Sequence, residues 1–183
     1  MANVIGSSPA VPIVCGECGL RSLPDAPDCA ALRDAVFARD FEQPALYWRH
    51  HRLAVDTYCV QHSSYVKSAK SLAAHLCGLC VALEHGNDPV LLQQNYLWLN
   101  AGVDLRKPAL PDFRGRLTIA DVCGIDDPSE YGRAVEAWAK SAWDAYRDSQ
   151  PIAREWLALS QQNSITRSEH GRETHRAGRG RRI

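Results

Sequence analysis

The sequence lacks long apolar segments and the usual signals of export. No run approaches the ~20 apolar residues that a membrane-spanning helix needs, and residues 1–12 contain neither the basic segment nor the apolar core of a signal peptide. We therefore expect a cytoplasmic protein with no membrane partner. Its seven cysteines should then be reduced, serving as metal ligands or as small core residues rather than in disulfides. Cys59, Cys77, Cys80 and Cys123 are expected in the core.

The motifs of several enzyme classes are also absent. The chain has no serine or cysteine nucleophile motif, no glycine-rich phosphate loop and no dinucleotide-binding fingerprint. It shows no internal repeat and no convincing strand pattern. Its 183 residues, 45% of them apolar, are enough for one full core and do not call for a second domain.

Helical spacing of apolar residues predicts an all-α fold, a single-domain helical bundle of about five or six helices with an N-terminal zinc knuckle. The expected helices cover residues 28–41, 44–62, 66–85, 88–100, 127–149 and 151–162, with a short helical turn at 118–122. Residues 102–115 contain two prolines and should form a loop. Trp138, Trp143 and Tyr146 lie on one face of the helix at 127–149, and we expect this face to pack into the core.

The chain divides into a flexible N-terminus at residues 1–12, a helical zinc-binding domain at 13–162 and a basic disordered tail at 163–183. The tail carries six arginines and only two acidic residues. Charge alone would let it contact nucleic acid or an acidic protein. No aromatic residue is interleaved with the arginines, so the simpler interpretation is a solvated, disordered end.

Cys15 and Cys18, separated by two residues and each followed by a glycine, are typical of a metal-binding knuckle. The alternatives are unligated thiols or a redox pair. For Zn²⁺, two further ligands are needed, and we expect Cys29, in the first turn of the first helix, and His51. Three sulfurs and one nitrogen form a closed tetrahedral set, which favours a structural ion over a catalytic one. Such an ion would pin the N-terminal segment to two helices.

The histidines cannot all belong to one site. His51 and His62 share a helix face but lie roughly 16 Å apart along the axis, so a single metal ion cannot bind both. If the helices at 44–62 and 66–85 form an antiparallel hairpin, His75 comes to lie near His51, Asp56 or Tyr58 rather than near His62. The sequence therefore predicts a polar group around His75 that is separate from His62.

Several motifs together resemble an uncharacterised bacterial family of small proteins known only as a domain of unknown function. They are Cys15-x-x-Cys18, Pro27-Asp28-Cys29, the HRLxVDxYxxQH stretch from His51 to His62, His75-Leu76 and Trp138-Ala139-x-x-x-Trp143. The likeness covers about residues 13–157, and the HRLxVDxYxxQH stretch is its most specific part. The resemblance implies a bacterial cytosolic protein with a cysteine knuckle, and it carries no known activity.

The resemblance draws attention to five polar residues on the second and third helices. In a functional pocket, Asp56 or His62 would act as a base, Tyr58 as a proton donor and Gln61 would orient a ligand, with His75 as a further catalytic candidate. In the structural alternative, Asp56 pairs with a neighbouring arginine, Tyr58 packs, and His62 ends its helix by bonding to backbone. Both interpretations stay open.

Two functions follow from these observations, and they leave open whether the protein is an enzyme. The first is a zinc-binding helical protein that binds or acts on a small molecule through a polar pocket near Asp56, His62 and His75, with the zinc in a structural role. The second is a non-enzymatic regulatory or interaction module whose zinc knuckle or basic tail contacts a protein or a nucleic acid.

Overall fold

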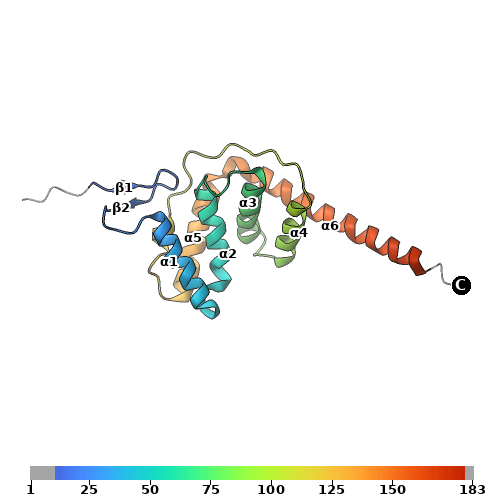
Figure 1. The fold of residues 1–183 in the computed structure, drawn as a ribbon, viewed down its shortest axis with the longest axis horizontal. Coiled ribbons are helices and arrows are strands. Elements are labelled where there is room, and N and C mark those ends of the chain that lie inside the picture. Colours follow the sequence, from blue (N-terminus) through green and yellow to red (C-terminus); the bar gives the residue numbers. More distant parts are fainter. Residues whose placement is uncertain (1–10, 180–183) are drawn as a thin grey trace, which may run out of the picture.

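The computed structural model describes the backbone of residues 11–179 and the side chains of residues 11–164. Helices dominate this range, as Figure 1 shows, and the prediction of an all-α, single-domain fold is confirmed. The elements are β1 (Ile13–Val14), β2 (Arg21–Ser22), α1 (Cys29–Glu42), α2 (Pro44–Gln61), α3 (Ala69–Glu84), α4 (Pro89–Asn100), the short 3₁₀ helix η1 (Ile119–Asp121), α5 (Pro128–Ala145), a second 3₁₀ turn η2 (Arg147–Ser149) and α6 (Gln150–Arg179).

The helices begin within one residue of their predicted starts, except α3, which begins at Ala69 rather than at residue 66. Asp28, Ser68 and Asp127 each accept a hydrogen bond from a backbone N–H in the first turn of the helix that follows, which satisfies donors that would otherwise lack a partner. Prolines occupy the first turns of α2, α4 and α5. Only Gln43 separates α1 from α2, so the two helices fold back on each other as an antiparallel pair.

The core is arranged around α2, which packs against α1, α3 and α5. The large residues of the α5 stripe are buried, as predicted, with Trp138 fully enclosed. One apolar cluster joins α3, α4 and α6 to this centre, and another joins the hairpin, α1 and η1 to it. Of the cysteines expected in the core, Cys59, Cys77 and Cys80 are buried and Cys123 is half-buried. The cluster at the hairpin end contains fewer buried residues than the other cluster.

The hairpin of β1 and β2 was not predicted. It is antiparallel, with Ile13 opposite Ser22 and Val14 opposite Arg21. Each strand has two residues, which is too short to produce a recognisable alternation of apolar and polar side chains. Figure 1 shows it at the end of the molecule opposite the C-terminal part of α6.

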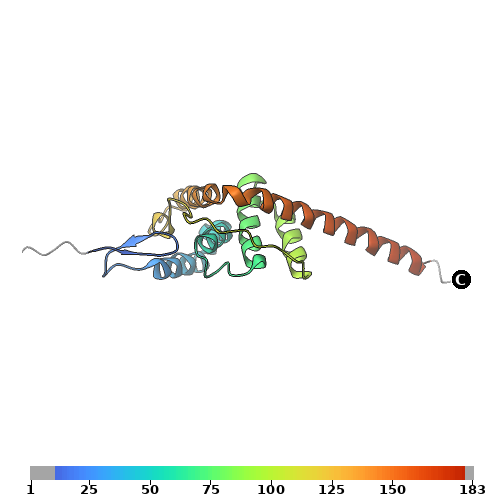
Figure 2. The ribbon, with the colours of Figure 1, turned by 90° about the horizontal axis from the view of Figure 1, so that it is seen from above.

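Helix α6 extends further than predicted. It continues past residue 162 to Arg179 and projects away from the bundle (Figure 2), so residues 163–179 are helical where the sequence suggested a disordered tail. The physical reason is that no proline or glycine interrupts the chain from Ile152 to His170. The expected flexible N-terminus lies largely outside the described residues, as do residues 180–183. Within the described range, no helix is long and apolar enough to cross a membrane.

Candidate metal centre

The knuckle is formed by the turn between β1 and β2. Cys15 directly follows β1, and its N–H donates to the carbonyl of Leu20 at 2.8 Å. The N–H of Gly19 donates back to the carbonyl of Cys15 at 3.0 Å, and the φ of +78° that this turn needs is one that glycine adopts without strain. The backbone of Leu20 also donates to the thiol of Cys18. The turn therefore holds both sulfurs on the same side of the hairpin.

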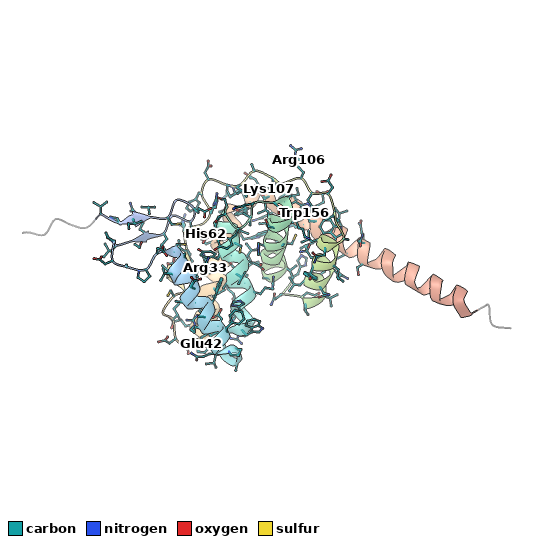
Figure 3. The ribbon with its side chains drawn as sticks, in the orientation of Figure 1. Arg33, Glu42, His62, Arg106, Lys107 and Trp156 are labelled. Carbon is teal, nitrogen blue, oxygen red and sulfur yellow. The ribbon has the colours of Figure 1, made fainter. Side chains whose placement is uncertain are left out.

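The other two candidate ligands come from the ends of α1 and α2. Cys29 is the first residue of α1, and His62 directly follows the last residue of α2. Because α1 and α2 are antiparallel and joined by one residue, the start of α1 lies beside the last turn of α2. This brings Cys29 Sγ to 2.9 Å from His62 Nε2. In Figure 3, His62 lies at this end of α2, next to the hairpin.

The four ligand atoms lie close enough together for one metal ion to contact all of them. The three sulfurs and the imidazole nitrogen all lie within 4.8 Å of one another. Cys18 Sγ is 3.5 Å from Cys29 Sγ, and Cys15 Sγ is 3.9 Å from His62 Nε2. With Zn–S distances of about 2.3 Å, tetrahedral geometry places sulfur ligands about 3.8 Å apart. The residues therefore fit a metal ion of that size.

The imidazole of His62 is oriented by its second nitrogen. Its Nδ1 lies 2.7 Å from the carbonyl oxygen of Tyr58; a carbonyl can only accept, so Nδ1 carries the proton. Nε2 then has its lone pair directed toward the sulfurs. The ring also stacks on the Tyr58 ring, with centroids 3.9 Å apart. A hydrogen bond from the non-ligating nitrogen to a carbonyl is the usual support for a metal-binding histidine.

Glu17, between the two knuckle cysteines, fastens the knuckle to the residues that follow His62. Its carboxylate accepts from the Ser63 hydroxyl at 2.5 Å, and from the Ser64 N–H at 3.0 Å and hydroxyl at 2.9 Å. Burial would raise the pKa of Glu17, but these three hydrogen bonds outweigh it and the pKa is lowered. The carboxylate is thus held ionised, and it fixes the knuckle against the end of α2.

The two buried thiols have shifted pKa values in the metal-free protein. The hydrogen bond with Cys29, together with burial, raises the pKa of Cys18 to about 12, whereas the same bond lowers the pKa of Cys29. Cys18 is therefore protonated at neutral pH until a cation displaces its proton.

His51 does not join this group, so its prediction as the fourth ligand is corrected to His62. His51 Nδ1 lies 3.1 Å from Oδ2 of Asp40, a fully buried carboxylate that also accepts from the Tyr131 hydroxyl at 3.1 Å. The ring of His51 stacks on Trp48. The single-residue link between α1 and α2 is the signal that could have identified His62, because it places Cys29 opposite the last turns of α2 rather than its middle.

Comparison with family models shows that the candidate ligands lie within a segment that matches one family. Residues 13–147 match the model of a family of unknown function, DUF5946. The chain belongs to this family. The matched segment contains all four candidate ligands and ends at η2, before α6. Neither the curated proteins nor the solved structures contain a significant match.

In this member of the DUF5946 family, Asp56 and His75 form a separate group, as the spacing predicts. His75 Nδ1 lies 2.9 Å from Asp56 Oδ1, and Arg52 Nη1 lies 2.5 Å from Asp56 Oδ2. Burial would lower the pKa of His75, but the hydrogen bond to Asp56 outweighs it and raises the pKa to about 10. The buried carboxylate is thus paired on both oxygens, which is the structural alternative for Asp56.

Gln61 uses its side-chain amide inside the protein. Its Nε2 donates to the carbonyls of Arg114 and Leu117 at 2.9 and 2.8 Å, and its Oε1 accepts from the indole N–H of Trp138 at 2.8 Å. The side chain is fully buried. Gln61 therefore ties α2 to α5 and to the loop before η1, and both of its donors are occupied.

A cavity of about 390 Å³ opens beside the candidate metal ligands. Cys15, Cys29 and His62 form part of its wall, together with Tyr58 and Tyr65. Of the five residues predicted to share one pocket, only Tyr58 and His62 line this cavity. The other three, Asp56, Gln61 and His75, are held elsewhere in the bundle.

A second group of metal-binding residue types lies at the end of α3. Cys80, Glu84 and His85 have ligand atoms close enough for one ion. Glu84, however, accepts two hydrogen bonds from Arg154 at 2.7 and 2.8 Å and a third from the indole of Trp143. Its carboxylate is thus already neutralised by a cation, and this group does not indicate a second metal centre.

Proposed function

We propose that Cys15, Cys18, Cys29 and His62 bind one Zn²⁺ ion and that the ion has a structural role. The observation that carries the proposal is the approach of three thiols and one oriented imidazole to within 4.8 Å of one another. Soft sulfur ligands with one imidazole in a tetrahedral arrangement favour zinc over magnesium or calcium. Four protein ligands leave no position for water, which is typical of structural rather than catalytic zinc.

Apart from the buried Leu20, the hairpin has few apolar contacts to hold it in place. Two-residue strands are not stable by themselves, and Ile13, Val14 and Leu23 keep 51–57% of their surface exposed. Few apolar contacts therefore oppose the entropy of freeing the segment. A metal ion would connect the hairpin to the start of α1 and the end of α2. The hydrogen bonds accepted by Glu17, described above, are the other polar connection at this place.

Elemental analysis of protein purified without added metal tests this function. We expect about one zinc per chain, and we expect removal of zinc by a chelator to lower the melting temperature and to release the hairpin to proteolysis before the helices. A parent protein without metal would refute the proposal. Bound zinc whose removal changes neither stability nor proteolysis would refute the structural role.

A second candidate function is binding of a small molecule in the cavity beside the metal ligands. Its volume of about 390 Å³ is in the range of small-ligand sites, and its wall includes the exposed ring of Tyr65 beside the buried Tyr58. Burial and the hydrogen bond with Cys29 raise the pKa of Tyr58, so its phenol stays protonated and can donate to a ligand. In a thermal-shift screen of metabolites, ligands of this cavity should lose their effect in Tyr65→Ala. Hits that are equally effective in that variant would count against the cavity.

A further inference from the structure

Two surface cavities meet along the outer face of α5. The larger, of about 830 Å³, lies between α2, the end of α3 and α5. The smaller, of about 600 Å³, lies between α5 and the loop that precedes η1. Both are lined by Ala137 and Lys140, so the two cavities adjoin on α5, and we call them together the α5 groove. Figure 1 locates α5 beside α2.

The α5 groove concentrates positive charge in a chain whose formal net charge is zero. Its lining includes two carboxylates, Glu136 and Asp144, and five cations: Arg49, Arg116, Arg133, Lys140 and Arg147. Of these five cations, only Lys140 forms an ion pair with a carboxylate of the described residues, that of Asp144. That pair is exposed, and such pairs contribute little. The groove therefore has a local excess of positive charge available to a ligand.

The groove also has an apolar floor and an exposed aromatic ring. Leu53 and Leu83 line one half, Ala137 lies at the junction, and Phe113, with 60% of its surface exposed, lines the other half. From Arg133 to Ala145 the helix rises ~18 Å at about 1.5 Å per residue. With at least ~3.4 Å of strand per nucleotide, this length accommodates about five nucleotides at most.

We propose that the α5 groove binds a single-stranded nucleic acid. The cations along α5 would contact successive phosphates, and bases would lie on the apolar floor with one stacked on Phe113, the combination by which single strands are bound without sequence preference. A duplex would keep its bases away from this floor. The groove is formed by residues other than the candidate metal ligands, so this proposal does not depend on the identity of the metal.

Fluorescence anisotropy with a labelled 12-nucleotide oligo(U), measured over a series of salt concentrations, tests the proposal on the full chain. We expect the logarithm of the affinity to fall linearly with the logarithm of salt concentration. Arg133→Ala and Lys140→Ala should each lower the magnitude of this slope by about 0.7, because each removes one phosphate contact. Phe113→Ala should weaken binding by roughly 5- to 160-fold, the effect of losing one stacked base. All three side chains lie on the surface, and the zinc content and helicity of each variant establish that it is folded.

The matched control is Lys67→Ala, an exposed cation outside the groove; it should leave both affinity and slope unchanged. A dissociation constant above about 10⁻⁴ M at physiological salt, which is the weak limit of non-specific binding, would overturn the proposal. A Lys67→Ala effect equal to that of Arg133→Ala would overturn the location. Equal competition by poly-glutamate, with no effect of Phe113→Ala, would show that the groove binds acidic peptide instead.

Discussion

Replacement of His62 by alanine distinguishes the candidate ligand set found in the structure from the one expected from sequence. In the structure, His62 Nε2 is the fourth candidate ligand atom, 2.9 Å from Cys29 Sγ, and its loss leaves three cysteines. His51, the alternative, contacts Asp40 instead. We therefore expect His62→Ala to lose zinc during purification or on mild chelation, and His51→Ala to retain about one zinc per chain.

The size of the effect follows from the ligand count. Structural zinc sites in small domains have apparent binding free energies of about 10–16 kcal/mol, so each of four ligands accounts for roughly 2.5–4 kcal/mol. Loss of one ligand should therefore weaken zinc binding by roughly 100- to 1,000-fold. At a free zinc concentration that saturates the parent, the free energy of unfolding of the variant falls by up to the contribution of the lost ligand. The total free energy of unfolding of a protein of this kind is about 5–15 kcal/mol.

Competition with a chromogenic chelator measures the affinity, and thermal unfolding with and without chelator measures the stability. His51→Ala is the matched control because it also destabilises the fold, by about 1–3 kcal/mol, through the buried Asp40 carboxylate that loses one partner. Zinc binding by His62→Ala as tight as that of the parent would refute the ligand assignment. So would a His51→Ala protein that folds but binds no zinc.

Three further predictions concern the polar groups inside the bundle. Gly78→Ala should lower the free energy of unfolding by about 1–3 kcal/mol in urea denaturation, although alanine normally favours a helix, because the added methyl would lie 2.8 Å from Arg52 Nη1 and still closer to the Asp56 carboxylate. Gln61→Leu should cost about 3–5 kcal/mol with zinc retained, because the Trp138 N–H and two carbonyls lose their partner; a neutral result would show that these groups find other partners. The folded-state pKa of His75, about 10, lies above its unfolded value of about 6.5. Its contribution to stability is therefore complete below pH 6.5 and disappears as the pH rises through 10. The stability difference between parent and His75→Gln should shrink over that interval, and a constant difference would contradict the raised pKa.

The sequence predicted the helices well because their ends carry local signals. The capping side chains of Asp28 and Asp127, with Pro27 before the first and Pro128 after the second, are read from neighbouring residues alone. The hairpin was missed because two-residue strands have no period, and its position depends on Cys15 and Cys18 reaching partners distant in sequence. The end of α6 was missed because charge and polarity suggested disorder, whereas the chain there contains nothing that ends a helix before Gly171.

The metal group was only partly predictable for a geometric reason. The spacing of Cys15 and Cys18 is a local signal, and Cys29 follows from its position at a helix start. The choice between His51 and His62 depends instead on the register of two helices. The register of α2 with α3 placed His75 beside Asp56, which the structure bears out. The register of α1 with α2 is fixed by a one-residue link. That register decides which histidine lies beside Cys29.

The knuckle and the α5 groove are connected at one end. Arg114 lies 3.9 Å from Glu17 of the knuckle, and it donates to the carbonyl of Gln61 at 3.1 Å. Its neighbours Phe113 and Arg116 line the groove. The loop that carries Phe113 is therefore held between the knuckle and α2, whereas Arg133 belongs to α5 alone. A structural ion would thus act on more than the hairpin, because it would also fix the segment that presents Phe113 to a ligand.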